Sequence, residues 1–244
     1  MVGSSQGVMS MVWLLLVLMI LGAASLDAAA HKPIAIGETR ATRDEAVRVV
    51  DIDVSQVIYT EITPELPQSW LFVETDGAFD LYVSVGVPRI ERLSGFRPAL
   101  AVIGPGLPDI ELPETVEVPD GAGAVLLRTS AIDEPDVFYE PVTGTGSWIL
   151  LRQTVRLPHA GRYDVVAFSL PEGETGETLS GKLWMAIGVR EKFGLRDILS
   201  LPRTMREVRA FHESPPRVSV SGWMRIAVLA AVIGIAVWAL VRKG

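Results

Sequence analysis

The sequence predicts a mainly β protein, an antiparallel β-sandwich of jelly-roll-like type that occupies residues 31–190. Short segments rich in Val, Ile, Leu, Tyr and Phe alternate with clusters of Pro, Gly and Asp from residue 34 to about residue 189. Helical periodicity is almost absent over this stretch, whereas a parallel α/β fold needs crossovers of about a dozen residues or more between its strands. Many short strands separated by frequent turns therefore favour a sandwich.

Turn signals separate the expected strands. Asp76-Gly77 supplies the backbone angles of a tight turn, so the segments on either side are expected to form a hairpin. Gly104–Pro108 is expected to be a loop, and Pro158–Gly161 a turn. The expected strands are 47–54, 56–62, 69–75, 79–87, 100–104, 124–129, 147–157, 162–170 and 182–188.

The pattern changes after Gly188, where apolar residues recur at helical spacing and arginines occupy much of the remaining surface. Ser200 is a plausible cap and Pro202 fits a first helical turn, so two short helices are expected, over 191–199 and 201–212. They would form an amphipathic helical stem that continues through a Pro-rich linker to residue 222. Such a helix can lie on lipid headgroups or pack under the sandwich, and the sequence leaves both open.

An apolar run over 223–241 has roughly the ~20 residues that span a bilayer. Trp223 and Trp238 lie near its ends, as interfacial residues often do, and Arg242 and Lys243 favour a cytoplasmic tail over 242–244. The run is predicted to be a single transmembrane helix. The alternative, a buried core helix, lacks following chain that would cover it.

Residues 1–30 resemble a signal peptide, with an apolar core followed by small residues at Ala28 and Ala30. Cleavage after Ala30 would leave His31 as the mature N-terminus. No Lys or Arg precedes the apolar core, so an uncleaved anchor helix is the alternative. Together the two ends predict a single-pass protein of the cell membrane, with its β domain on the periplasmic or extracellular side.

Composition excludes several classes of function. The chain has 244 residues, a net charge of −7 and no cysteine. An acidic exported part disfavours nucleic acid as a partner. Without cysteine, a disulfide framework and a thiolate metal site are both excluded. The domain must therefore be held together by packing.

Two segments of the β region resemble bacterial pre-peptidase C-terminal-type β domains. One is 70–85, Trp-Leu-Phe-Val-Glu-Thr-Asp-Gly-Ala-Phe-Asp-Leu-Tyr-Val-Ser-Val, and the other is 157–168, with a Pro-x-Ala-Gly-x-Tyr turn at Pro158–Tyr163. The final segment 181–188 is also similar. The resemblance covers about residues 69–188 and implies a jelly-roll-like accessory domain that is itself non-catalytic.

Two metal sites are conceivable from the residues alone. A mature N-terminal His31 would offer an α-amine and an imidazole, which with His159 could bind copper. The alternative is that His31 simply begins a frayed terminus. Calcium could be held by the carboxylates of an acidic loop, for which a solvated loop is the alternative. The candidate calcium ligands are Asp133, Glu134, Asp136 and Glu140.

No motif predicts an enzyme. Gly144-Thr-Gly-Ser147-Trp lacks the spacing of a nucleophile elbow, and His159 is the one candidate base within the β domain. Walker loops, H-E-x-x-H and dinucleotide fingerprints are absent. The favoured function is a non-catalytic accessory or interaction subunit of a bacterial membrane complex, with membrane-protein partners. One alternative is an exported ligand- or copper-binding protein that uses the mature N-terminal His31. Another is a surface glycan-binding module, although aromatic residues on strands usually belong to the core. Its candidate stacking residues are Trp70, Tyr82, Tyr139, Trp148, Tyr163 and Trp184.

Overall fold

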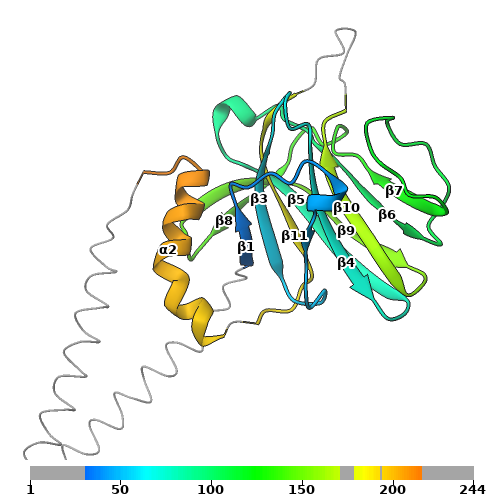
Figure 1. Ribbon diagram of the computed structural model, residues 1–244. Helices are drawn as coiled ribbons and strands as arrows, with labels where there is room; N and C mark the ends of the chain where they lie inside the picture. The colour runs from blue at the N-terminus through cyan, green and yellow to red at the C-terminus, as the bar shows by residue number, and fades with distance from the viewer. Residues whose placement is uncertain (1–30, 171–178, 193, 216–244) are drawn as a thin grey trace, which may run out of the picture.

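In the part of the chain that the structure describes, two β-sheets pack face to face and one α-helix lies outside them (Figure 1). This computed structural model describes residues 31–170, 179–192 and 194–215. The predicted signal peptide and the predicted transmembrane run at 223–241 lie outside the described residues. Within the described ranges, no helix has the length and apolar character needed to cross a membrane.

Eleven strands make up the two sheets. The six-stranded sheet runs in the order β1 (Lys32–Ile36), β3 (Gln56–Ile62), β11 (Gly181–Ile187), β5 (Phe79–Pro88), β9 (Thr145–Leu157) and β8 (Asp136–Glu140). The five-stranded sheet runs in the order β2 (Val47–Arg48), β4 (Gln68–Thr75), β10 (Gly161–Phe168), β6 (Ala99–Pro105) and β7 (Ala122–Leu127). Short 3₁₀ turns occur at η1 (Arg43–Glu45) and η2 (Glu91–Leu93).

The strand pairs are nested within one another. β6 pairs with β7, β5 with β9, β4 with β10 and β3 with β11, all antiparallel. Each outer pair thus encloses the next, and successive pairs alternate between the two sheets. Only the short strands β1 and β2 join their neighbours in parallel. The predicted mainly β sandwich is confirmed.

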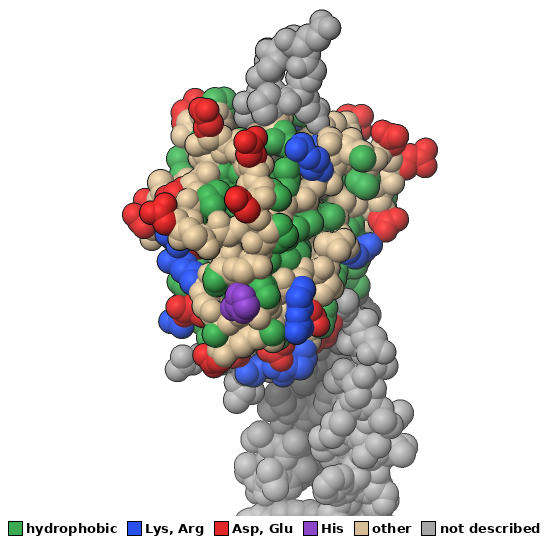
Figure 2. All heavy atoms as spheres, turned by 90° about the vertical axis from the view of Figure 1, so that its right-hand side faces the viewer, with side chains coloured by type: hydrophobic (Ala, Val, Ile, Leu, Met, Phe, Trp, Pro, Cys, Tyr) green, Lys and Arg blue, Asp and Glu red, His purple; other side chains and the backbone are tan. Residues whose placement is uncertain are grey.

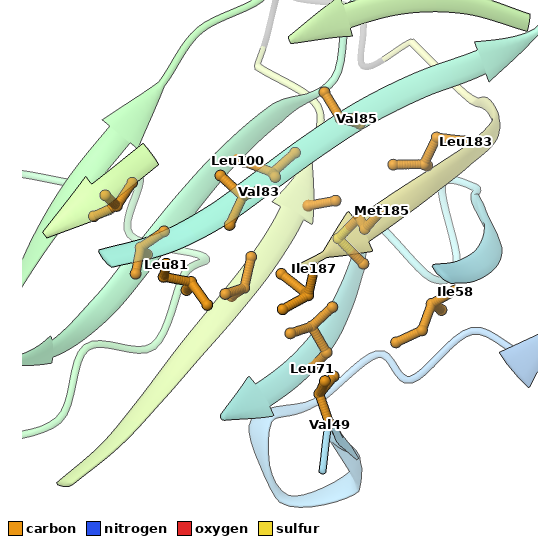
Figure 3. Close-up of a cluster of buried hydrophobic side chains, with 14 of the residues drawn as sticks. Val49, Ile58, Leu71, Leu81, Val83, Val85, Leu100, Leu183, Met185 and Ile187 are labelled. Carbon is orange, nitrogen blue, oxygen red and sulfur yellow. The ribbon is translucent and has the colours of Figure 1, made fainter. Parts of the chain in front are cut away.

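Alternation along the strands builds the core between the sheets. In β5, Leu81, Val83 and Val85 are 0% exposed and point inward. Leu183, Met185 and Ile187 of β11 join them, with Leu71 and Leu100 from the opposite sheet (Figure 3). Burying an aliphatic side chain contributes about 1.5–3 kcal/mol, so this cluster is the main source of stability in a domain without disulfides.

The connection between β6 and β7 covers the outer face of the five-stranded sheet. Val116 is buried there and Leu112 packs beside it, against a cluster that includes Trp70 and Phe168. Gln68 strengthens this contact, because its amide donates to the Thr115 carbonyl at 2.5 Å. The outer face of this sheet is therefore a second apolar layer.

Three predicted features of the β region are wrong. Asp76-Gly77 does not close a hairpin, because β4 and β5 belong to different sheets and the turn carries the chain between them. The segment 47–54 contributes only the short strand β2, since its chain turns at Asp51, which has a positive φ of 52°. The acidic stretch predicted as a loop includes an edge strand, β8, which pairs with β9.

Helix α2 (Leu195–Phe211) replaces the two short helices that were predicted. Ser200 does not cap a second helix; its hydroxyl donates to the Asp197 carbonyl at 3.0 Å. Asp197 instead caps the start, where its carboxylate accepts the Gly194 N–H at 2.8 Å. Pro202 lies inside the helix, where it removes a hydrogen bond without ending it. The packing of the last turns on the sandwich offsets that loss.

Candidate functional site beneath helix α2

The last turns of α2 pack on the outer face of the six-stranded sheet. Val208 and Phe211 are 0% and 7% exposed. The Phe211 ring meets the Tyr59 ring edge to face, with 5.3 Å between centroids. The cluster under the helix also contains Val57, Ile149, Trp184 and Ala186. The structure thus resolves the open question about the stem for its carboxyl-terminal half, which packs on the sandwich.

Trp184 crosses a neighbouring strand to reach the helix site. It lies on β11 opposite Gly86 of β5, and a Cβ at Gly86 would stand 2.6 Å from Trp184 Cε2. Only glycine leaves room for the indole to lie over β5. The indole N–H thereby reaches β9 and donates to Ser147 Oγ at 3.0 Å.

Ser147 links Trp184 to His212, the residue that follows α2. Ser147 Oγ lies 3.2 Å from His212 Nε2, and His212 Nδ1 lies 2.9 Å from the Val208 carbonyl. Because a carbonyl only accepts, Nδ1 carries the proton and Nε2 accepts the hydroxyl proton of Ser147. The chain of donors therefore runs from Trp184 through Ser147 and His212 to the backbone of α2. Every polar group in this buried chain has a partner.

Burial keeps His212 neutral. Desolvation lowers the pKa of His212 below its ordinary value of 6.5, and the Lys182 cation lowers it further, while the bond to the Val208 carbonyl opposes them. The pair has the form of a nucleophile and a base. Yet both residues are buried, and the Trp184 N–H occupies the same oxygen. The arrangement is suited to holding the helix in place and to responding to protons.

Charged groups fasten the end of the helix. Arg209 is only 8% exposed, and its guanidinium donates to the Thr143 carbonyl at 2.6 Å and to the Pro215 carbonyl. A cation in the last turn also suits the helix dipole. Glu213 pairs with Arg92 and, at 2.8 Å, with Lys182, and Arg92 is the larger cause that lowers the Glu213 pKa to about 2. The path of the chain out of the domain is therefore fixed as far as Pro215.

Acidification should weaken this attachment. A histidine whose folded pKa is lowered binds its proton more readily in the unfolded chain, so its stabilising effect is complete above about pH 6.5 and declines below it. We expect the free energy of unfolding, measured in urea, to fall as the pH drops below about 6.5. His212→Gln should show a shallower decline than the native chain. If the free energy of unfolding depended on pH identically in the native chain and in His212→Gln, His212 would not be the group that weakens the attachment of α2.

The structure separates the two predicted copper ligands. His31 is half-buried beside Trp184, with 6.1 Å between ring centroids, and its Nδ1 bonds to Ser55 Oγ. Burial lowers the pKa of His31, and Arg152 lowers it further. Trp184, the neighbour of His31, pairs with Gly86 of β5. Leu157, two residues before His159, pairs with Phe79 at the start of the same strand. That part of β5 spans about 23 Å, so His31 and His159 lie far apart.

The predicted calcium ligands do not converge either. Asp136 and Glu140 lie at opposite ends of β8, which places them about 13 Å apart. Asp136 pairs with Arg152 at 2.9 Å, and Glu140 accepts the Val142 N–H at 3.2 Å. Asp133 and Glu134 precede the strand and are exposed. Over the described ranges, no group of three or more His, Asp or Glu side chains is arranged to hold a metal ion.

The aromatic residues considered for glycan stacking do not form one surface. Trp70, Tyr163 and Trp184 are at most 4% exposed and belong to the packing layers. Tyr139 is 60% exposed, at the edge strand β8. Burial therefore removes Trp70, Tyr163 and Trp184 from any stacking surface, and a glycan-binding role stays a prediction.

A separate groove opens between β7 and β9. Its volume is about 380 Å³. Figure 2 shows apolar side chains gathered in the middle of the face toward which β7 lies. The groove is lined by Gly106, Leu107, Pro108, Val125, Leu127, Gln153, Thr154, Val155, Arg156 and Pro158. It lies apart from the site under α2, with which it shares no lining residue.

Comparison with known proteins adds no assignment: no family model and no curated protein matches the chain. The resemblance to pre-peptidase C-terminal-type domains therefore remains a likeness in sequence pattern. Its first segment is not a hairpin, since β4 and β5 lie in different sheets.

Proposed function

We propose that this protein is a single-pass membrane-anchored, exported β-sandwich that acts as a non-catalytic interaction subunit of a bacterial membrane complex. Its nested strand pairs, alternating between two sheets, support assignment of the sandwich to the jelly-roll class. The anchor is the apolar run 223–241, and the leader over 1–30 would direct export.

The observation that carries the proposal is the attachment of α2 to the sandwich. Phe211, His212 and Glu213 are all bound to the sheets or to the loops that border them. Only seven residues, 216–222, separate the last described residue from the apolar run. A stem fixed to the domain holds it at a set distance from the bilayer, which suits a subunit that presents one surface to a neighbour.

Purification in a mild detergent tests the proposal. The full chain with an affinity tag should co-purify with at least one other membrane protein, identified by mass spectrometry. Cells that express the untagged chain provide the control for proteins that bind the resin. Recovery of the chain as a lone monomer would count against an interaction subunit.

Membrane topology can be tested separately because the chain has no cysteine. Val118→Cys, at an exposed site between β6 and β7, should react in intact cells with a thiol reagent that does not cross membranes. Gly244→Cys should react only after the membrane is permeabilised. The reverse pattern would refute the proposed orientation.

A further inference from the structure

The amino-terminal half of α2 is not covered by the sandwich. Leu199 is 81% exposed and Leu201 is 36% exposed, whereas Val208 two turns later is fully buried. In Figure 1 this half of the helix projects beyond the start of β1, which it contacts through an ion pair of 3.0 Å between Lys32 and Asp197. Leu201 lies two turns before Val208, on the side that faces the sandwich, so Leu199 is the leucine left without a partner in the described structure.

Cations accompany the exposed side chain of Leu199. Arg203 and Arg206 follow Leu199 at spacings of four and three residues, which places all three on one face of the helix. Arg203 pairs with Glu207 at 2.7 Å in an exposed contact of little energy. Arg206 donates only to the Pro202 carbonyl at 3.3 Å and has no carboxylate partner among the described residues. An apolar tip bordered by arginines is complementary to an anionic, partly apolar surface.

The number of residues between Pro215 and the apolar run 223–241 is large enough for the membrane to lie at the amino-terminal end of α2. From Phe211 back to Leu199 the helix rises about 18 Å. Residues 216–222, fully extended, span about 24 Å. The chain can therefore return along α2, so that the apolar run enters the bilayer at the level of Leu199.

We infer that the amino-terminal half of α2 lies in the headgroup layer of an anionic membrane. Leu199 contacts the acyl boundary, while Arg203 and Arg206 on the same face bind lipid phosphates. This inference rests on the proposed membrane anchor. It adds a second contact, which sets the orientation of the sandwich on the bilayer.

A fluorescent label at a single cysteine tests the inference. Leu199→Cys in the full chain, labelled with an environment-sensitive dye, is reconstituted into phosphatidylcholine vesicles that contain phosphatidylglycerol and a nitroxide-labelled lipid. Val118→Cys is the matched control, because Val118 is also exposed but lies between β6 and β7, two strands on the opposite side of Figure 1 from α2. The dye at residue 199 should lose most of its emission to the nitroxide, and the dye at residue 118 should lose none. Omitting phosphatidylglycerol, or the change Arg203→Gln with Arg206→Gln, should reduce the loss at residue 199.

The outcomes separate the inference from the anchor. A chain that floats with the vesicles, yet shows no quenching at residue 199, overturns the lipid contact and leaves the anchor intact. The same holds if the dye at residue 199 shifts to the blue without quenching, since protein would then cover the tip. A chain that does not float with the vesicles overturns the anchor and the inference with it.

Discussion

Gly86→Ala should destabilise the sandwich by about 1–3 kcal/mol, the usual cost of overpacking a filled interior. A Cβ at residue 86 would stand 2.6 Å from Trp184 Cε2 and 2.8 Å from the Trp148 carbonyl oxygen. The backbone oxygen cannot rotate away, so the indole must move. Its movement breaks the bond to Ser147 and loosens the contact with α2. Denaturant unfolding, followed by tryptophan fluorescence, measures the change.

Gly77→Ala is the matched control for this substitution. Gly77 also lies next to β5, but a Cβ there would meet no atom within 4 Å, and its φ is not positive. Its effect should stay within about 0.5 kcal/mol, as for other surface changes. Equal denaturant midpoints of unfolding for Gly86→Ala and Gly77→Ala would show that the position of the Trp184 indole does not require the space above Gly86.

Phe211→Ala should release α2 from the sandwich. The ring is 7% exposed and packs on Tyr59, and truncating a buried phenylalanine costs about 3–5 kcal/mol. Much of this cost should appear as local opening of the helix, because the core between the sheets is intact. Limited trypsin digestion should then cleave after Arg203 and Arg206 far faster than in the native protein.

Leu199→Ala serves as the control for release of the helix. Leu199 is on the same helix but 81% exposed, so its truncation removes almost no packing. The rate of cleavage after Arg203 and Arg206 should match that of the native chain. Equal resistance of Phe211→Ala would instead mean that the charged contacts of Arg209 and Glu213 suffice to hold the helix.

Strand positions were predictable where one face of a strand is apolar. The expected strand 56–62 coincides with β3, and 79–87 is within one residue of β5, because alternating inward residues specify both. β8 was missed because its residues are acidic and partly exposed at a sheet edge. The hairpin at Asp76-Gly77 was wrong because turn residues specify a change of direction, not the sheet that the next strand enters.

The site under α2 could not have been predicted from sequence spacing. Ser147 and His212 lie on different elements far apart in the chain, and only the packing of α2 brings them together. By sequence, the surroundings of Ser147 lack the spacing of a nucleophile elbow, and the candidate base within the β domain is His159. The one available signal was the small residue Gly86, whose place opposite Trp184 depends on strand register.

The nested pairing has a consequence for the order in which the molecule forms. β6 and β7 are close in the chain and can pair early, whereas β3 must wait for β11, which begins at residue 181. Contacts between distant parts of a chain close slowly. Until β11 is in place, β3 and β5 each keep an open edge that can recruit another chain. β11 therefore completes the six-stranded sheet, and α2 can pack on that sheet only after β11 is in place.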